Sequence, residues 1–257
     1  MIGFLIKKTF FDIWDNLFKV ALINLGFIIS FAIPVFIPPL LKSSPILSFI
    51  TLIIGILWCF IYLSATAFSL KTVSDYGSFG FIDFFKNFPL ALPSGLVTGG
   101  LVCVLFLLVT IVIPFYLSMS SIFGLLLAAV IFWTIVIGIL ALQFFLPIRT
   151  RLDTSIPKVF KKCFLIFFDN PFFCLFSFVY CFITLIISAF LALLFPGPAG
   201  LLLYLDEALR LRLLKYDFLE KNPDADRKKI PWDALLIEDR EKTGTRTLRN
   251  FIFPWKD

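Results

Sequence analysis

Charged residues are absent from four long tracts of the chain, and this pattern predicts helices that cross a membrane. The tracts cover residues 20–41, 43–70, 87–148 and 170–205. A bilayer core about 30 Å thick is crossed by about 20 apolar residues in a helix, so the first two tracts fit one helix each and the third fits two. The chain is therefore predicted to be an all-α, polytopic transmembrane helical bundle.

The fourth tract contains one full helix and then a shorter apolar run that ends at charged residues. After the turn Pro196-Gly197-Pro198, the run continues as far as Asp206. A helix that starts at the far interface and rises about 1.5 Å per residue would place Asp206 near the bilayer midplane and reach the near face around Lys215. Six spans are thus predicted, at residues 18–40, 46–70, 93–117, 122–145, 171–195 and 198–216.

Three similar segments, each apolar, aromatic, charged, Asn and apolar in turn, stand directly before the predicted pairs of spans. They are Ile13-Trp14-Asp15-Asn16-Leu17, Phe84-Phe85-Lys86-Asn87-Phe88 and Phe167-Phe168-Asp169-Asn170-Pro171. The repetition predicts three units, each an interfacial helix plus a hairpin, inserted the same way up. The alternative is that such residues simply collect at membrane interfaces. We expect Asn16, Asn87 and Asn170 to cap the entering helices by accepting backbone N–H bonds.

Basic residues gather on one side of the predicted spans, and Lys42 stands alone on the other. Since Lys and Arg near helix ends stay in the cytoplasm, both termini are predicted to be cytoplasmic, as six crossings also require. Residues 217–257 then form a cytoplasmic tail. Because disordered segments contain few aromatic residues, we expect Leu248–Trp255 to fold back on the chain or the membrane face, or to dock a partner.

Composition agrees with lipid as the main solvent and gives little support to catalysis. Of the 257 residues, 60% are apolar and 16% are charged, and the mean hydropathy is +0.99. The chain has no His, its five Cys show no CxxC spacing, and it lacks a nucleotide-binding fingerprint, so we expect no enzyme, metal site or cofactor. Cytoplasmic loops that attract anionic lipid explain the net charge of +6 without nucleic-acid binding.

The candidate functional residues are four charges in the predicted sixth span: Asp206, Glu207, Arg210 and Arg212. Ionisable groups inside a membrane are costly, and by default they face the bundle interior or a wet cavity. The spacing allows Asp206 or Glu207 to pair with Arg210 within one helix. In the alternative interpretation the helix slides along the inner leaflet while its basic side chains reach water. Two polar residues of other spans complete the candidate cluster, Asn24 and Gln143.

A broader pattern links the openings of the second and third hairpins with the end of the last one. Phe84–Pro89 and Phe167–Pro171 open the hairpins, and Pro196-Gly197-Pro198 is followed by Tyr204 and a basic helix end. In this pattern residues 10–215 resemble the YesL-like group of bacterial integral membrane proteins and, more distantly, the multi-span regions attached to some glycerophosphodiester phosphodiesterases. The resemblance implies a bacterial inner-membrane protein, in some cases linked with sugar uptake, and brings no catalytic residues.

The sequence favours an accessory or scaffolding subunit of a membrane complex, with the bilayer and either another membrane protein or a second copy as partners. The alternative is a small transporter or lipid-handling protein. It would have a polar cavity around the sixth span, lined by Asp206, Glu207, Arg210, Asn24 and Gln143. A wet cleft that reaches Asp206 would favour transport, whereas Phe and Leu that fill the centre would favour a scaffold.

Overall fold

The computed structural model describes residues 1–152, 155–227, 229–244 and 246, and this part of the chain is helical without strands. The first half contains α1 (Ile2–Asp15), α2 (Leu17–Leu40), α3 (Pro45–Ser74), α4 (Phe81–Lys86), α5 (Phe88–Leu107), the π-helical segment η1 (Leu108–Val112) and α6 (Ile113–Ser118). The second half contains α7 (Ile122–Leu142), α8 (Phe145–Arg151), α9 (Ile156–Asp169), α10 (Pro171–Phe190), α11 (Gly197–Lys221), α12 (Trp232–Leu235) and α13 (Ile237–Thr243). The predicted all-α fold class is confirmed.

Five helical stretches are long and apolar enough to cross a membrane: Leu17–Leu40, Pro45–Ser74, Phe88–Ser118, Ile122–Arg151 and Pro171–Phe190. The chain is therefore a multi-pass integral membrane protein. The predicted sixth span, 198–216, falls within α11 and is not among the five, because charged residues recur from Asp206 onwards.

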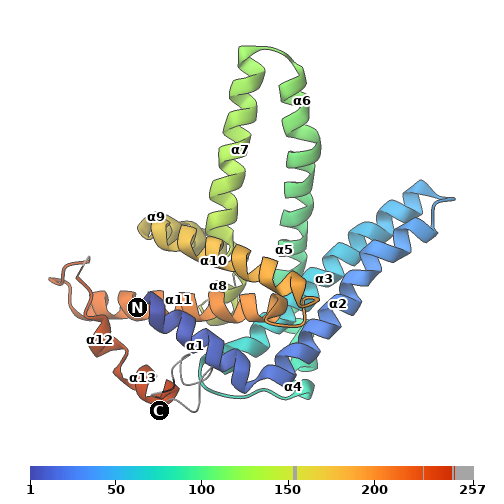
Figure 1. The fold of residues 1–257 in the computed structure, drawn as a ribbon. Helices are drawn as coiled ribbons and strands as arrows, with labels where there is room; N and C mark the ends of the chain where they lie inside the picture. The colour runs from blue at the N-terminus through green and yellow to red at the C-terminus, as the bar shows by residue number, and fades with distance from the viewer. Residues whose placement is uncertain (153–154, 228, 245, 247–257) are drawn as a thin grey trace.

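Two long hairpins diverge from a shared base (Figure 1). One is formed by α2 and α3, and the other by α5, η1 and α6 with α7 and α8. The third helix pair, α10 and α11, runs across this base in the same view, and α11 packs against α1, α2, α3 and α8. The third pair therefore does not repeat the arrangement of the first two.

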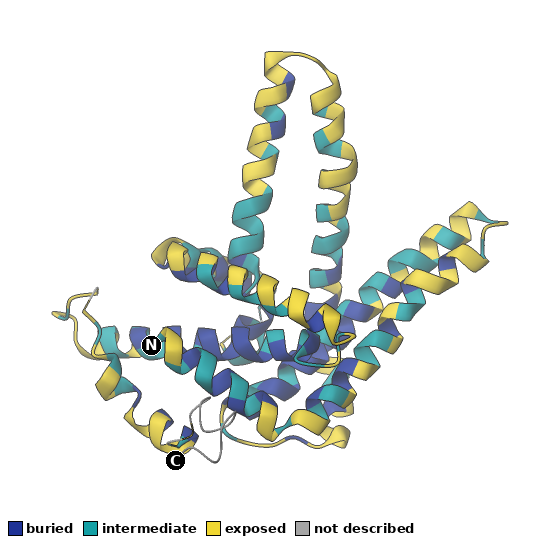
Figure 2. Cartoon of the chain, in the orientation of Figure 1, coloured by how far each residue is buried: buried dark blue, intermediate teal, exposed yellow. Residues whose placement is uncertain are grey.

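Burial is concentrated at the base, whereas the outer parts of the two long hairpins are largely exposed (Figure 2). Large apolar side chains lie on these exposed surfaces, among them Phe36, Phe106 and Trp133. Lipid solvates such surfaces without the cost they would have in water. The apolar interior of the base includes Phe144, Tyr204 and Leu209.

Close packing of α3 against α5 depends on two glycines four residues apart, Gly95 and Gly99. A Cβ atom on Gly95 would lie 2.8 Å from the backbone nitrogen of Ile61, and one on Gly99 would lie 2.9 Å from a methyl carbon of Leu57. Small residues allow helix backbones to approach each other in a membrane. Gly95 and Gly99 therefore mark a close contact of α5 with α3.

The three helices that precede the hairpins differ in length and surroundings. α1 and α9 each contain 14 residues, whereas α4 contains six. The side chains of Leu5 and Phe11 on α1 are buried, so α1 is partly covered by protein. A separate helix does precede each helix pair, but its interfacial position and the internal repeat stay predictions.

Candidate functional site

The two acidic residues of α11 lie inside the base and are held by basic residues of other helices. Asp206 is 3% exposed and accepts hydrogen bonds from Arg151 of α8, at 2.8 Å from Nε and 2.5 Å from Nη2. The same guanidinium donates to Ser74 at 2.8 Å and to Asp75 at 2.9 Å, both at the end of α3. Arg151 therefore ties α8, α11 and α3 together.

Glu207, 1% exposed, points to α1 rather than to Arg151. Its carboxylate accepts a hydrogen bond of 3.1 Å from the Lys8 ammonium and another from the Thr9 hydroxyl. Lys8 also pairs with Asp12 and donates to the Ser74 carbonyl at 3.1 Å. Burial alone would lower the pKa of Lys8, but the nearby carboxylates of Glu207 and Asp12 outweigh that effect and raise it. Lys8 is therefore held as a cation.

Arg210 connects α11 to the C-terminal helix α13. Its guanidinium donates to both carboxylate oxygens of Asp239, at 2.8 and 3.0 Å, a bidentate geometry that fixes orientation. The Tyr76 hydroxyl donates to the same carboxylate at 3.1 Å. Three cations surround the Tyr76 ring: the Lys8, Lys242 and Arg210 side chains lie 4.3, 5.2 and 5.4 Å from its centroid.

These residues form one network, which we call the base cluster: Lys8, Thr9, Asp12, Ser74, Asp75, Tyr76, Arg151, Asp206, Glu207, Arg210 and Asp239. The expected ion pair of Asp206 or Glu207 with Arg210 is wrong. Each of these side chains finds its partner on another helix instead, because tertiary packing brings an opposite charge within 3.1 Å of it. Sequence reasoning missed Tyr76. Its place just after a predicted span was its only signal in the sequence. In the structure its backbone is left-handed, with a φ of 62°.

Arg212, the fourth predicted charge, lies in different surroundings. Its guanidinium donates to Asn170 at 3.2 Å and lies 3.6 Å from the centroid of the Phe173 ring. Lys215, one turn on, donates to Asn170 at 3.0 Å and pairs with Asp169 at 3.2 Å. Asn170 thus anchors the end of α11 to the junction of α9 and α10.

The expected capping role of Asn16, Asn87 and Asn170 is wrong, because no side chain of the three caps the helix that follows. Asn16 donates to the Asp12 carbonyl at 3.0 Å, and Asn87 donates to the Ser69 hydroxyl at 3.0 Å. The side chains turn toward neighbouring polar groups, since the preceding helix runs almost directly into the next one. Asn87, for example, has helical backbone angles, with φ −77° and ψ −14°.

Asn24 and Gln143 do not join the four charges, so the predicted common cavity is not formed. Asn24 donates to the carbonyls of Leu194 and Pro196 at 3.0 and 2.8 Å, and it accepts from the Ala199 backbone nitrogen at 2.9 Å. It therefore fastens the turn between α10 and α11 to α2. Gln143 donates to the Cys174 carbonyl at 2.9 Å and joins α7 to α10.

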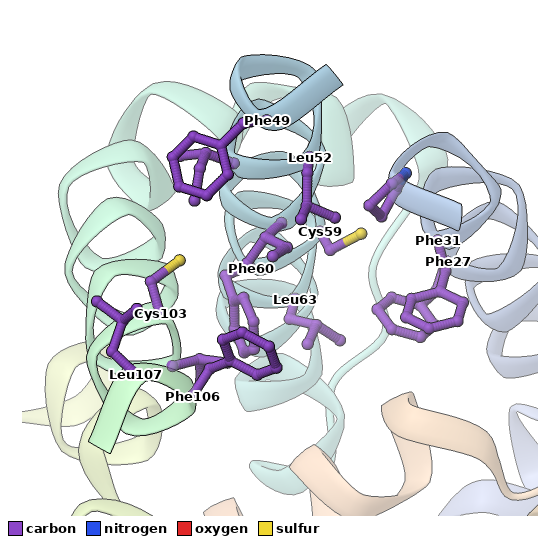
Figure 3. A pocket seen from close by; sticks show the side chains of 14 residues that line it. Phe27, Phe31, Phe49, Leu52, Cys59, Phe60, Leu63, Cys103, Phe106 and Leu107 are labelled. Carbon is purple, nitrogen blue, oxygen red and sulfur yellow. The ribbon is translucent and has the colours of Figure 1, made fainter. Parts of the chain in front are cut away.

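Two large apolar pockets lie among the membrane-spanning helices. Neither is lined by Asp206 or Glu207. The first pocket, of about 520 Å³, has α3 as its floor and α2 and α5 as its walls (Figure 3). Phe31, Cys59 and Phe106 are among its lining residues. These apolar pockets lie apart from the acidic pair of α11, whose surroundings are the polar side chains of the base cluster.

The base cluster can hold five elements of the chain together, and its geometry suits that structural role. Within the described residues, no three His, Cys, Asp or Glu side chains are arranged to hold a metal ion. The tail is attached at Asp239, while the predicted anchor at Leu248–Trp255 lies outside the described residues. No family model, curated protein or solved structure matches the chain.

Proposed function

We propose that the protein is an accessory or scaffolding subunit of a membrane complex. The observation that carries this proposal is that Asp206 and Glu207 are buried and fully paired. Ionisable groups that serve a transport pathway face a cavity that water or substrate can reach. Here the same groups brace a rigid base that carries two divergent apolar hairpins, an arrangement that leaves wide helical surfaces for other membrane proteins.

Co-purification tests the scaffolding role. With cross-linking before extraction in mild detergent, we expect the tagged chain to retain at least one integral membrane protein in a near-equal molar amount. The matched control is an unrelated tagged membrane protein of similar size, expressed to the same level. Recovery of the chain alone, together with a solute-uptake activity that the Glu207→Gln variant loses, would instead support the small transporter.

Contacts between the two ends of the described chain support a topology with an even number of crossings. Lys7 donates to the Gly244 carbonyl at 3.0 Å, and Arg246 pairs with Asp15 at 2.9 Å, so α1 and α13 lie at one end of the molecule. We propose that this end is cytoplasmic, since the basic residues of the base lie there. The resemblance to YesL-like proteins supports a bacterial inner membrane.

The third helix pair is too shallow to complete a crossing in this proposal. Its turn is bonded to Asn24, which lies only about 10 Å along α2 from Leu17 at 1.5 Å per residue. The hydrocarbon core is about 30 Å thick. We therefore propose four complete crossings, with α10 and α11 entering the membrane and returning on the same side.

Cysteine labelling in intact cells separates this topology from six crossings. We expect Lys42→Cys, in the turn between α2 and α3, to react with a membrane-impermeant maleimide from outside. Ala192→Cys, in the exposed turn after α10, should react only after the membrane is opened. Equal labelling of both variants in intact cells would contradict the shallow third pair and favour six crossings. The unsubstituted chain corrects for its five free cysteines.

A further inference from the structure

A second large apolar pocket, of about 510 Å³, lies between the two arms of the second long hairpin. One wall follows the α5 arm from Thr98 to Leu108, and the other includes Thr134 and Gly138 of α7. Phe145 and Phe164 close its inner end. We call this space the hairpin groove. Both of its walls belong to membrane-spanning stretches, so its occupant comes from the bilayer.

The chemistry of the hairpin groove suits a hydrocarbon chain rather than a polar molecule. Its two threonine hydroxyls are already used within their own helices. Thr98 donates to the Ser94 carbonyl at 2.7 Å, and Thr134 donates to the Val130 carbonyl at 2.8 Å. The other lining groups are apolar, so the groove offers contact area but no free hydrogen-bond donor to a ligand.

The depth of the groove matches one leaflet. Between Thr98 and Leu108 the α5 arm rises about 15 Å at 1.5 Å per residue. This is half of the roughly 30 Å hydrocarbon thickness. The groove starts at the base of the molecule, where α8 and α9 lie, so it occupies the leaflet on the side of the base.

A cation lies one helical turn from a lining residue of the groove. Phe164, which closes the groove, is on the amphipathic helix α9, and the exposed Lys161 precedes it by one turn on the same face. Phe160 stacks on Phe145 with ring centroids 5.2 Å apart, which fixes α9 against the foot of the arm. Phosphate oxygens of a lipid are attracted to such a lysine.

We propose that the hairpin groove is a binding site for an anionic phospholipid of the leaflet next to the base. One acyl chain fills the space between α5 and α7, and the phosphate lies against Lys161. The lipid then joins two helix arms that the protein alone leaves apart. The site does not depend on the scaffolding role, because it would exist in a transporter as well.

Native mass spectrometry of the full chain, delipidated in detergent and supplied with phosphatidylglycerol or phosphatidylcholine, tests the site. Gly138→Phe places a ring in the groove at a position where an added Cβ meets no atom within 4 Å. We expect it to lower the affinity for both lipids roughly tenfold, since several methylene groups lose their contacts. The matched control is Gly100→Phe, equally unobstructed but not in the groove lining, which should bind lipid like the wild type.

Charge variants test the headgroup half of the site. Lys161→Gln should lower the affinity for phosphatidylglycerol about fivefold and leave that for phosphatidylcholine unchanged, because one cation near the phosphate is lost. Lys42→Gln makes the same change at the other end of the molecule and should alter neither affinity. An unchanged lipid preference in Lys161→Gln would overturn the headgroup assignment.

Equal lipid binding by Gly138→Phe and Gly100→Phe would overturn the acyl-chain site. A second contradicting result is a change of oligomeric state in Gly138→Phe with unaltered lipid binding. That result would make the groove an interface with another polypeptide.

Discussion

Replacing Asp206 with alanine will lower the free energy of unfolding by about 3–5 kcal/mol, the usual effect of removing one partner of a buried ion pair. Among the described residues, the variant leaves the Arg151 guanidinium inside the base with Ser74 and the partly exposed Asp75 as its side-chain hydrogen-bond acceptors. Arg151 cannot lose its charge to escape this cost, because arginine stays protonated in proteins. Thermal or denaturant unfolding in one detergent, followed by helical circular dichroism, measures the change.

The control for this prediction is Asp83→Ala, which breaks an ion pair of the same charge types on the surface. Asp83 and Lys86 are 3.7 Å apart, and their side chains are 61% and 72% exposed. Exposed pairs of this kind contribute at most about 1 kcal/mol, so the control should change stability little. Asp206→Asn keeps the size of the side chain and isolates the loss of charge. Equal destabilisation by Asp206→Ala and Asp83→Ala would show that the base cluster is solvated and not buried.

The bilayer itself explains why the long hairpins were predictable. A helix in lipid must satisfy its backbone internally and expose apolar side chains, so spans such as 46–70 are visible as uncharged tracts. The structure places that span in α3, at Pro45–Ser74. The ends extend by a few residues, because polar residues continue the helix beyond the apolar tract.

The base could not be predicted in the same way, because its partners are far apart in the sequence. The pairs of Arg151 with Asp206 and of Lys8 with Glu207 join residues 55 and 199 positions apart. Local spacing along α11 pointed instead to Arg210, which is bound to Asp239. Patterns within one helix reveal which charges need partners, but only the tertiary arrangement decides which partner each one meets.

The proposed shallow placement of the third helix pair also depends on a residue far away in the sequence. Hydropathy identified the apolar run after Pro198 as half a span, and the length of the run agreed with that interpretation. The turn between α10 and α11 is held to α2, since Asn24 bonds to Leu194, Pro196 and Ala199. An isolated Asn in a long apolar helix was the available signal. Such an Asn marks a polar contact between helices, and here Asn24 contacts the backbone of the turn between α10 and α11.

Replacing Gly95 with leucine should destabilise the protein by about 3 kcal/mol, because the new side chain has no room between α3 and α5. Its Cβ would meet the backbone of Ile61, including the nitrogen at 2.8 Å, and a helix backbone cannot move aside as a flexible side chain can. Separating the two helices would also disturb the contact of Ser64 with Ser94, whose hydroxyl oxygens are 2.6 Å apart. Unfolding in detergent, measured as for Asp206→Ala, gives the size of the effect.

Gly100→Leu supplies the matched comparison for Gly95→Leu on the same helix. A Cβ at Gly100 meets no atom within 4 Å, so the leucine there should point into open space. Both variants gain the same helix propensity over glycine, about 0.8 kcal/mol, and that gain cancels in the comparison. The difference between them therefore isolates the contact of α5 with α3. If Gly95→Leu unfolds no more easily than Gly100→Leu, the two helices are not packed backbone to backbone.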